Sequence, residues 1–119
     1  MINIKMGDLY DGYKALIKLS QRETSFGLAL SIADIIDNSK NKVIEYEKQR
    51  TKIIEKYAKR VDDNKYRVLP EKIEEFTNAM DEIFQLEFTL PVSKISVERF
   101  GDIEITAEEV SALRWLIET

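Results

Sequence analysis

The sequence predicts a mainly α fold, a helical hairpin or small bundle built around one long central helix. One apolar stripe at helical spacing continues from about residue 25 to residue 61, and shorter stripes of the same period precede and follow it. Only four glycines and two prolines interrupt the 119 residues, of which 44% are hydrophobic and 34% charged. This composition is typical of a folded, helix-rich chain, and the length predicts a single domain over residues 1–119.

The first predicted helix lies within residues 5–20, where apolar residues on one face oppose charged residues on the other. The apolar positions are Met6, Leu9, Tyr10, Tyr13, Leu16 and Ile17. The polar stretch QRETS then breaks the pattern. Within it, Thr24 or Ser25 suits the N-cap of the following helix.

The central helix is predicted over about residues 25–61 because its apolar stripe keeps its phase through the polar stretch DNSKN. At 1.5 Å per residue this helix would be roughly 50 Å long. Its first half carries further apolar residues on other faces, which predicts burial on more than one side. These residues are Phe26, Ala29, Leu30 and Ala33. The second half is apolar on one side only.

Three further elements follow the central helix. The stretch VDDNKYRVLP holds a polar turn between β-forming residues, so a hairpin and a plain loop are both open. Pro70 suits the first turn of a third helix ending near residue 85. Alternation through Leu86, Phe88 and Leu90 predicts a minor β element near 86–105. A C-terminal helix should begin at Thr106, which forms a capping-box pattern with Glu109.

Two local stretches, YEKQRTKIIEKYA in the central helix and ALRWLI near the end of the chain, stand within a characteristic order of predicted elements. In that order a short helix precedes the long one, and an acidic helix, a strand segment and a final helix follow it. Over nearly its whole length the chain resembles a family of small uncharacterised proteins from tailed phages and prophages of Gram-positive bacteria. The resemblance involves no catalytic motif. It implies a mobile-element protein acting in the bacterial cytoplasm.

The absence of cysteine and histidine excludes several chemistries. Thiol nucleophiles, disulfides, zinc sites of the usual ligands and histidine general bases all require these residues. We therefore expect a protein that is not an enzyme and that uses no cofactor and no metal. There is no apolar run long enough to span a bilayer and no signal-peptide pattern, so we expect a cytoplasmic location and no membrane contact.

Charge is distributed unevenly along the chain. The net charge of −4 comprises −1 over residues 1–39, +5 over 40–67 and −8 over 68–119. A lysine face on the long helix is predicted from Lys48, Lys52, Lys56 and Lys59. It could contact phosphates, but interleaved glutamates favour a solvated helix face. The acidic last third could instead mimic the charge of a nucleic acid toward a basic partner.

Arg50 interrupts the apolar stripe of the central helix, where a charge is costly unless it is paired or reaches solvent. A paired Arg50 would have Glu74, Glu75 or a carboxylate on another chain as its partner. If the second half of this helix projects from the domain, Ile53 and Tyr57 need another element or subunit to cover them.

Trp115 is the only tryptophan, and on a helix starting at Thr106 it points away from the apolar face. One interpretation packs Trp115 and Ala112 against the N-terminal region. The other makes the two residues part of a protein interface, where tryptophan is enriched.

These features favour a non-catalytic phage or prophage accessory protein that acts through protein–protein interaction in assembly, replication or host takeover. Its candidate partner-binding residues are Trp115, Ala112, Arg50, Ile53 and Tyr57. We expect a phage or host protein as partner, together with homo-oligomers. Two alternatives stay open: an inhibitor of a host enzyme or defence system that uses the acidic C-terminal surface, and a nucleic-acid-binding module that uses the lysine face.

Overall fold

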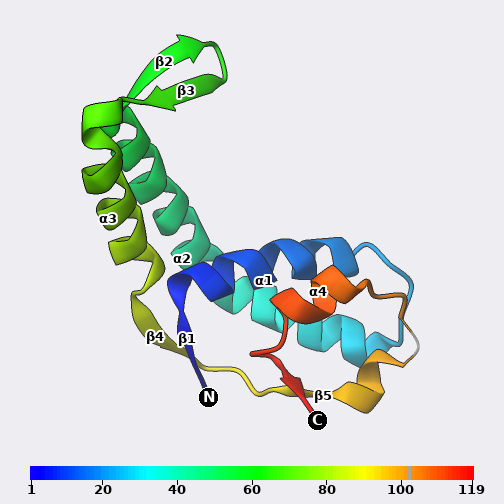
Figure 1. Ribbon diagram of the computed structural model, residues 1–119. Helices are drawn as coiled ribbons and strands as arrows, with labels where there is room; N and C mark the ends of the chain where they lie inside the picture. Colours follow the sequence, from blue (N-terminus) through cyan, green and yellow to red (C-terminus); the bar gives the residue numbers. More distant parts are fainter. Residues whose placement is uncertain (102) are drawn as a thin grey trace.

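A computed structural model describes residues 1–101 and 103–119. These residues form a mainly α structure with a body and a projecting arm (Figure 1). The helices are α1 (Met6–Leu19), α2 (Phe26–Tyr57), α3 (Ile73–Phe84) and α4 (Ala107–Ala112). The prediction of a mainly α fold around a long central helix is confirmed.

The body is built where α1 packs on the N-terminal half of α2, with α4 against α1. Buried aliphatic side chains from these helices and from the strand segments form one core. Its fully buried members include Leu9, Leu16, Leu28, Leu90 and Leu113. The α2 helix begins as predicted, because the Ser25 Oγ accepts a hydrogen bond from the backbone N–H of Leu28 at 3.3 Å.

The α2 helix is continuous through residues 38–41 but bends between its two halves (Figure 1). Ser39, near the middle of α2, is fully buried, and its hydroxyl donates to the Ile35 carbonyl at 2.7 Å. Such bonding from a serine to the preceding turn competes with the helical backbone bond and bends helices. The bend separates the half of α2 that belongs to the body from the half that enters the arm.

Two details predicted for the central helix are wrong. The helix ends at Tyr57, not near Val61, because Ala58–Asp62 form strand β2 and pair with β3 (Lys65–Val68). The first half is also buried on one side only. Phe26 is 78% exposed and Leu30 54% exposed, since no described element covers the face opposite the core.

The arm consists of the second half of α2, the α3 helix beside it, and the β2–β3 hairpin at its tip (Figure 1). The stretch VDDNKYRVLP therefore forms a hairpin. Pro70 begins a short 3-10 helix, η1 (Pro70–Lys72), that leads into α3, as its missing N–H and fixed φ favour. A hydrogen bond from the Leu69 N–H to the Tyr57 carbonyl joins the hairpin base to the end of α2.

Short strands connect the remaining segments. Strand β4 (Glu87–Leu90) lies in the predicted β region, and it pairs antiparallel with β1 (Ile2–Lys5), which the sequence reading missed. Strand β5 (Ile95–Ser96) pairs parallel with β6 (Ile117–Glu118). A 3-10 helix, η2 (Val97–Phe100), follows β5.

The C-terminal helix begins at the predicted cap but ends at Ala112, so its expected continuation as far as Trp115 is wrong. Leu113 and Leu116 are fully buried in a turn. The Leu116 carbonyl accepts a hydrogen bond from the Ile95 N–H at 2.8 Å, and pairing with β5 draws the chain out of the helix. Trp115 therefore lies on a turn and not on the back of a helix.

Candidate functional site

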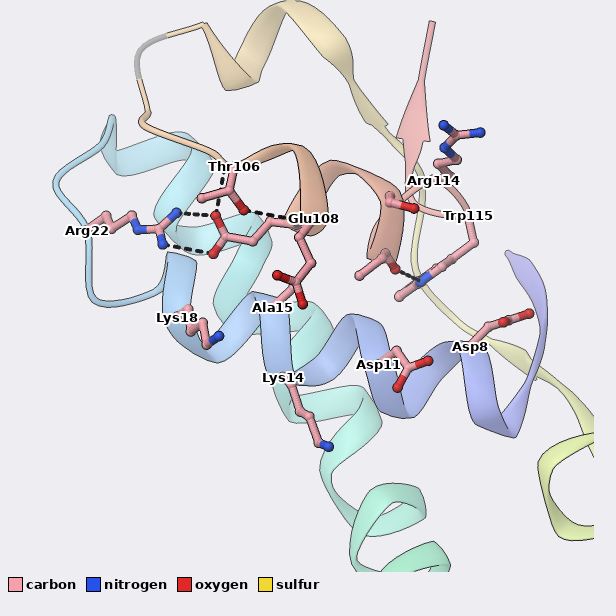
Figure 2. Close-up of a pocket in the computed structure, with 13 residues that line it drawn as sticks. Asp8, Asp11, Lys14, Ala15, Lys18, Arg22, Thr106, Glu108, Arg114 and Trp115 are labelled. Carbon is pink, nitrogen blue, oxygen red and sulfur yellow. Dashed lines mark hydrogen bonds and ion pairs between the residues drawn. The ribbon is translucent and has the colours of Figure 1, made fainter. Parts of the chain in front are cut away.

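A groove of about 900 Å³ runs between α1 and the segment containing α4 and the following turn (Figure 2). Its floor and rim combine one aromatic ring with charges of both signs. The lining residues are Asp8, Asp11, Lys14, Ala15, Lys18, Arg22, Thr106, Glu108, Glu109, Ser111, Ala112, Arg114 and Trp115. The groove thus includes Trp115 and Ala112, two of the residues predicted to bind a partner.

Trp115 is fixed at one end of this groove. Its indole Nε1 donates a hydrogen bond to the Ala112 carbonyl at 2.9 Å. The ring lies so close to α1 that a Cβ atom on Gly12 would come within 2.6 Å of Nε1. Trp115 is half-buried, so it packs on the N-terminal region and still presents part of its ring to the groove. Whether that exposed part binds a protein stays a prediction.

The other end of the groove is closed by an ion pair between Arg22 and Glu109 (Figure 2). The Arg22 Nη1 and Nη2 atoms donate to the two carboxylate oxygens of Glu109 at 2.6 and 2.8 Å. The same Nη1 also donates to the Glu104 carbonyl at 2.8 Å. This fork fixes the loop after α1 against the start of α4.

Glu109 is also the N3 residue of the predicted capping box. Its carboxylate accepts from the Thr106 N–H at 2.9 Å, while its own N–H donates to the Thr106 Oγ1 at 3.1 Å. Hydrogen bonding by Arg22 is the largest cause that lowers the pKa of Glu109, from 4.5 to about 2. The most buried carboxylate of the groove is therefore ionised and fully engaged at neutral pH.

The rim of the groove carries exposed charges of both signs. Among the residues with described positions, Asp8, Asp11, Lys18, Glu108 and Arg114 form no ion pair. Lys14 places its ammonium group over the Tyr10 ring, 4.2 Å from the centroid. The part of the chain with described positions also holds no group of three acidic side chains arranged to bind a metal ion. This surface can form ion pairs around an aromatic contact.

Arg50 lies in the arm near its junction with the body and is half-buried. Its Nη1 donates to the Tyr10 hydroxyl at 3.0 Å, and its guanidinium lies 5.4 Å from the centre of that ring. The Tyr10 ring also packs against Tyr46, with 4.9 Å between centroids. The predicted carboxylate partners on α3 are therefore wrong, and a tyrosine of α1 takes their place.

The other predicted residues of the long helix lie along the arm, apart from the groove. Ile53 and Tyr57 are half-buried on the half of α2 that α3 accompanies, so this chain covers them in part. Lys48, Lys52 and Lys56 are exposed on α2. Lys59 is exposed on β2 and does not extend the helical stripe. The predicted partner-binding residues are thus divided between two regions.

The hairpin at the tip of the arm carries three basic side chains, Lys59, Lys65 and Arg67, on one face. Lys59 is directly opposite Arg67, and Lys65 lies two residues from Arg67 on the same strand. Alternation along a strand places all three side chains on one face. In the described structure none of them forms an ion pair, whereas Arg60 pairs with Asp63 at 3.2 Å. The register of the two strands, which composition does not reveal, creates this face.

Comparison with known proteins returns no relative: no family model, curated protein or solved structure matches the chain. In the described part of the chain, no helix combines the length and the apolar character needed to cross a membrane.

Proposed function

We propose that this protein is a non-catalytic accessory protein of a phage or prophage, and that it acts by binding another protein. The observation that carries the proposal is the position of Trp115. Its partly exposed ring lies in a groove rimmed by charges of both signs. An aromatic anchor surrounded by charged groups is typical of the residues that dominate protein interfaces.

The chemistry of the groove supports binding over catalysis. An acid or base catalyst needs a group that can exchange a proton near neutral pH. Glu109 has its pKa lowered to about 2 and is held by both Arg22 and Thr106. The other rim charges suit complementary contacts with a partner, which would set its orientation.

Two kinds of partner fit this proposal. An assembly, replication or host-takeover factor would bind a phage product or host machinery, and an inhibitor would bind a host enzyme or defence protein. Five of the twelve acidic residues in the last third, where the inhibitor surface is expected, belong to η1 and α3. These exposed carboxylates are Glu71, Glu74, Glu75, Asp81 and Glu82. The identity of the captured partner separates the two versions.

Capture from phage-infected cells tests the proposal. The variant Lys14→Glu/Arg114→Glu reverses two exposed charges on the groove rim and retains Trp115. The matched control, Lys48→Glu/Lys52→Glu, makes the same charge change on the exposed face of α2. A partner retained by the wild type and the control but lost by the rim variant is the expected result. Equal recovery with all three proteins would contradict a groove-based function.

The basic face of the hairpin supports a second candidate function, nucleic-acid binding. A two-stranded β ribbon fits the major groove of DNA, and Lys59, Lys65 and Arg67 could contact phosphates. Duplex affinity should then fall as salt rises, and Lys65→Ala/Arg67→Ala should reduce the salt slope by about two counterions. Unchanged affinity in that variant, or binding with no salt dependence, would eliminate this function.

A further inference from the structure

The N-terminal half of α2 carries a second apolar stripe that the body leaves uncovered. Phe26 and Leu30 are 78% and 54% exposed, and Ala29 and Ala33 are exposed beside them. At 100° per residue, Phe26, Leu30 and Ala33 fall within about 60° of arc. They lie roughly opposite Leu28, Ile32 and Ile35, which face the core. The stripe therefore forms an apolar surface on the outside of the body.

The side chains of this stripe suit close contact with another helix. Ala29 and Ala33 are one turn apart, so the helix backbone can be approached closely beside the two large side chains. Leu30 and Phe26 project between these small residues. Large side chains of one helix can then enter the spaces above small side chains of the other.

The charges beside the stripe indicate which partner fits. Arg99 of η2 reaches the flank of α2, where its Nη2 donates to the Ser31 Oγ at 3.0 Å and lies near Gly27. Asp34 lies on this same flank, about one helical turn further along α2. In the described structure neither Arg99 nor Asp34 has an ion-pair partner. A basic group and an acidic group thus follow each other along one edge of the stripe.

This order is self-complementary under a two-fold axis. If two copies of α2 pack antiparallel with the axis between Leu30 and Ala33, Leu30 of each copy meets Ala33 of the other. This axis runs perpendicular to both helices, so the corresponding flanks of the two copies lie on the same side of the interface. Arg99 of each copy then approaches Asp34 of the other. The interface would contain this attractive charge pair twice. A parallel arrangement, with the axis along the helices, would place the two Arg99–Asp34 flanks on opposite edges of the interface and would form no such pair.

We propose that the protein forms an antiparallel homodimer through this stripe, with Leu30 opposite Ala33 of the second copy and Arg99 opposite Asp34. The dimer surface lies on α2 and η2, away from the Trp115 groove. The inference therefore does not rest on the proposed function, and both groove and hairpin would stay available in the dimer.

Sedimentation of the wild type and of Leu30→Glu tests self-association. The wild type should show twice the mass of the 13.9 kDa chain, and Leu30→Glu should sediment at the mass of one chain. The control is Leu86→Glu, which changes a leucine of similar exposure, 58%, in the segment between α3 and β4. A monomeric wild type, or loss of the dimer in the control as well, would overturn the proposal.

A charge exchange tests the orientation of the two copies. Asp34→Arg alone and Arg99→Asp alone should each weaken dimerisation by about tenfold, because each creates two like-charge contacts per dimer. The double variant Asp34→Arg/Arg99→Asp should regain most of the wild-type affinity. Additive weakening in the double variant would contradict the pairing.

Cross-linking gives an independent readout of the register, and the chain contains no cysteine to interfere. A mixture of Leu30→Cys and Ala33→Cys proteins should form the mixed disulfide faster than either protein links to itself. Preferential linking of Leu30→Cys to itself would indicate a parallel or shifted contact and would overturn the antiparallel register. A monomer that still captures a partner through the groove would overturn this inference but not the proposed function. A dimer that captures no partner through the groove would contradict the proposed function but not this inference.

Discussion

At the scale of single residues, Glu109 joins two structural roles that are usually separate. It completes the cap of α4 and it neutralises Arg22 from the loop after α1. The sequence predicted the cap from the spacing of Thr106 and Glu109. Arg22 lies 87 residues away, and no local pattern indicated that its side chain would reach this carboxylate.

Glu109→Gln should lower the free energy of unfolding by about 1 to 2 kcal/mol at pH 7. The substitution replaces the Arg22–Glu109 ion pair with a hydrogen bond to a neutral amide, while the capping pattern is retained. The Arg22 side chain is 31% exposed, so water screens the pair and a larger loss is not expected. Denaturant titration measures the change. Glu109→Ala should cost more because it also removes the hydrogen bond that the carboxylate accepts from the Thr106 N–H.

The contribution of Glu109 should depend on pH. Folding lowers the pKa of Glu109 from 4.5 to about 2, so the folded protein favours the ionised form. The resulting stabilisation is fully present above about pH 4.5 and is lost as pH falls toward 2. The stability difference between wild type and Glu109→Gln should therefore shrink from pH 7 to pH 3. A difference that grows on acidification would contradict this assignment.

Replacing Gly12 with alanine should change the stability in the opposite direction to that normally expected within a helix. In a helix interior, glycine to alanine normally stabilises by about 0.5 to 1 kcal/mol. Here the added Cβ would meet the Trp115 ring, so Gly12→Ala should destabilise by about 1 to 3 kcal/mol and shift the tryptophan emission. In a Trp115→Ala background the same change should become stabilising. Stabilisation in both backgrounds would show that the ring does not lie on Gly12.

At the scale of elements, the two antiparallel strand pairs should differ in protection from hydrogen exchange. The β1–β4 pair buries Ile2, Ile4 and Leu90, whereas residues 59–67 of the β2–β3 hairpin are exposed. An isolated two-stranded hairpin is marginally stable in water. Amides of residues 58–68 should exchange on the order of ten to a hundred times faster than those of β1 and β4. Equal protection in a monomeric sample would contradict this prediction.

Predictability also differed between elements for a physical reason. The three longer helices repeat their apolar pattern over several turns, so the sequence located them from periodicity alone. Strand β1 has four residues and β6 has two, and each exists because a distant strand, β4 or β5, supplies its hydrogen bonds. The same pairing ends α4 early and moves Trp115 from a helix face to the groove. The long-range contacts that position the candidate site therefore lay outside what local patterns could predict.

At the scale of the whole molecule, the arm makes the protein elongated. The described chain extends 50 × 28 × 23 Å, and its radius of gyration is 16.7 Å. A compact domain of this length would have a radius of about 13 to 14 Å. Small-angle scattering of monomeric Leu30→Glu should give the larger value. A radius near the smaller value would mean that the arm folds back onto the body in solution.

The pairing of the first strand with a strand near residue 90 also constrains how the chain reaches this structure. The α1 and α2 helices can form from neighbouring residues, but Ile2 meets Leu90 only after most of the chain is available. Leu113 and Leu116 complete the same core later still. Contacts of such long sequence separation carry a high loop-closure cost and slow folding. During synthesis on the ribosome, the apolar faces of α1 and α2 should therefore stay exposed until Leu113 and Leu116 have emerged.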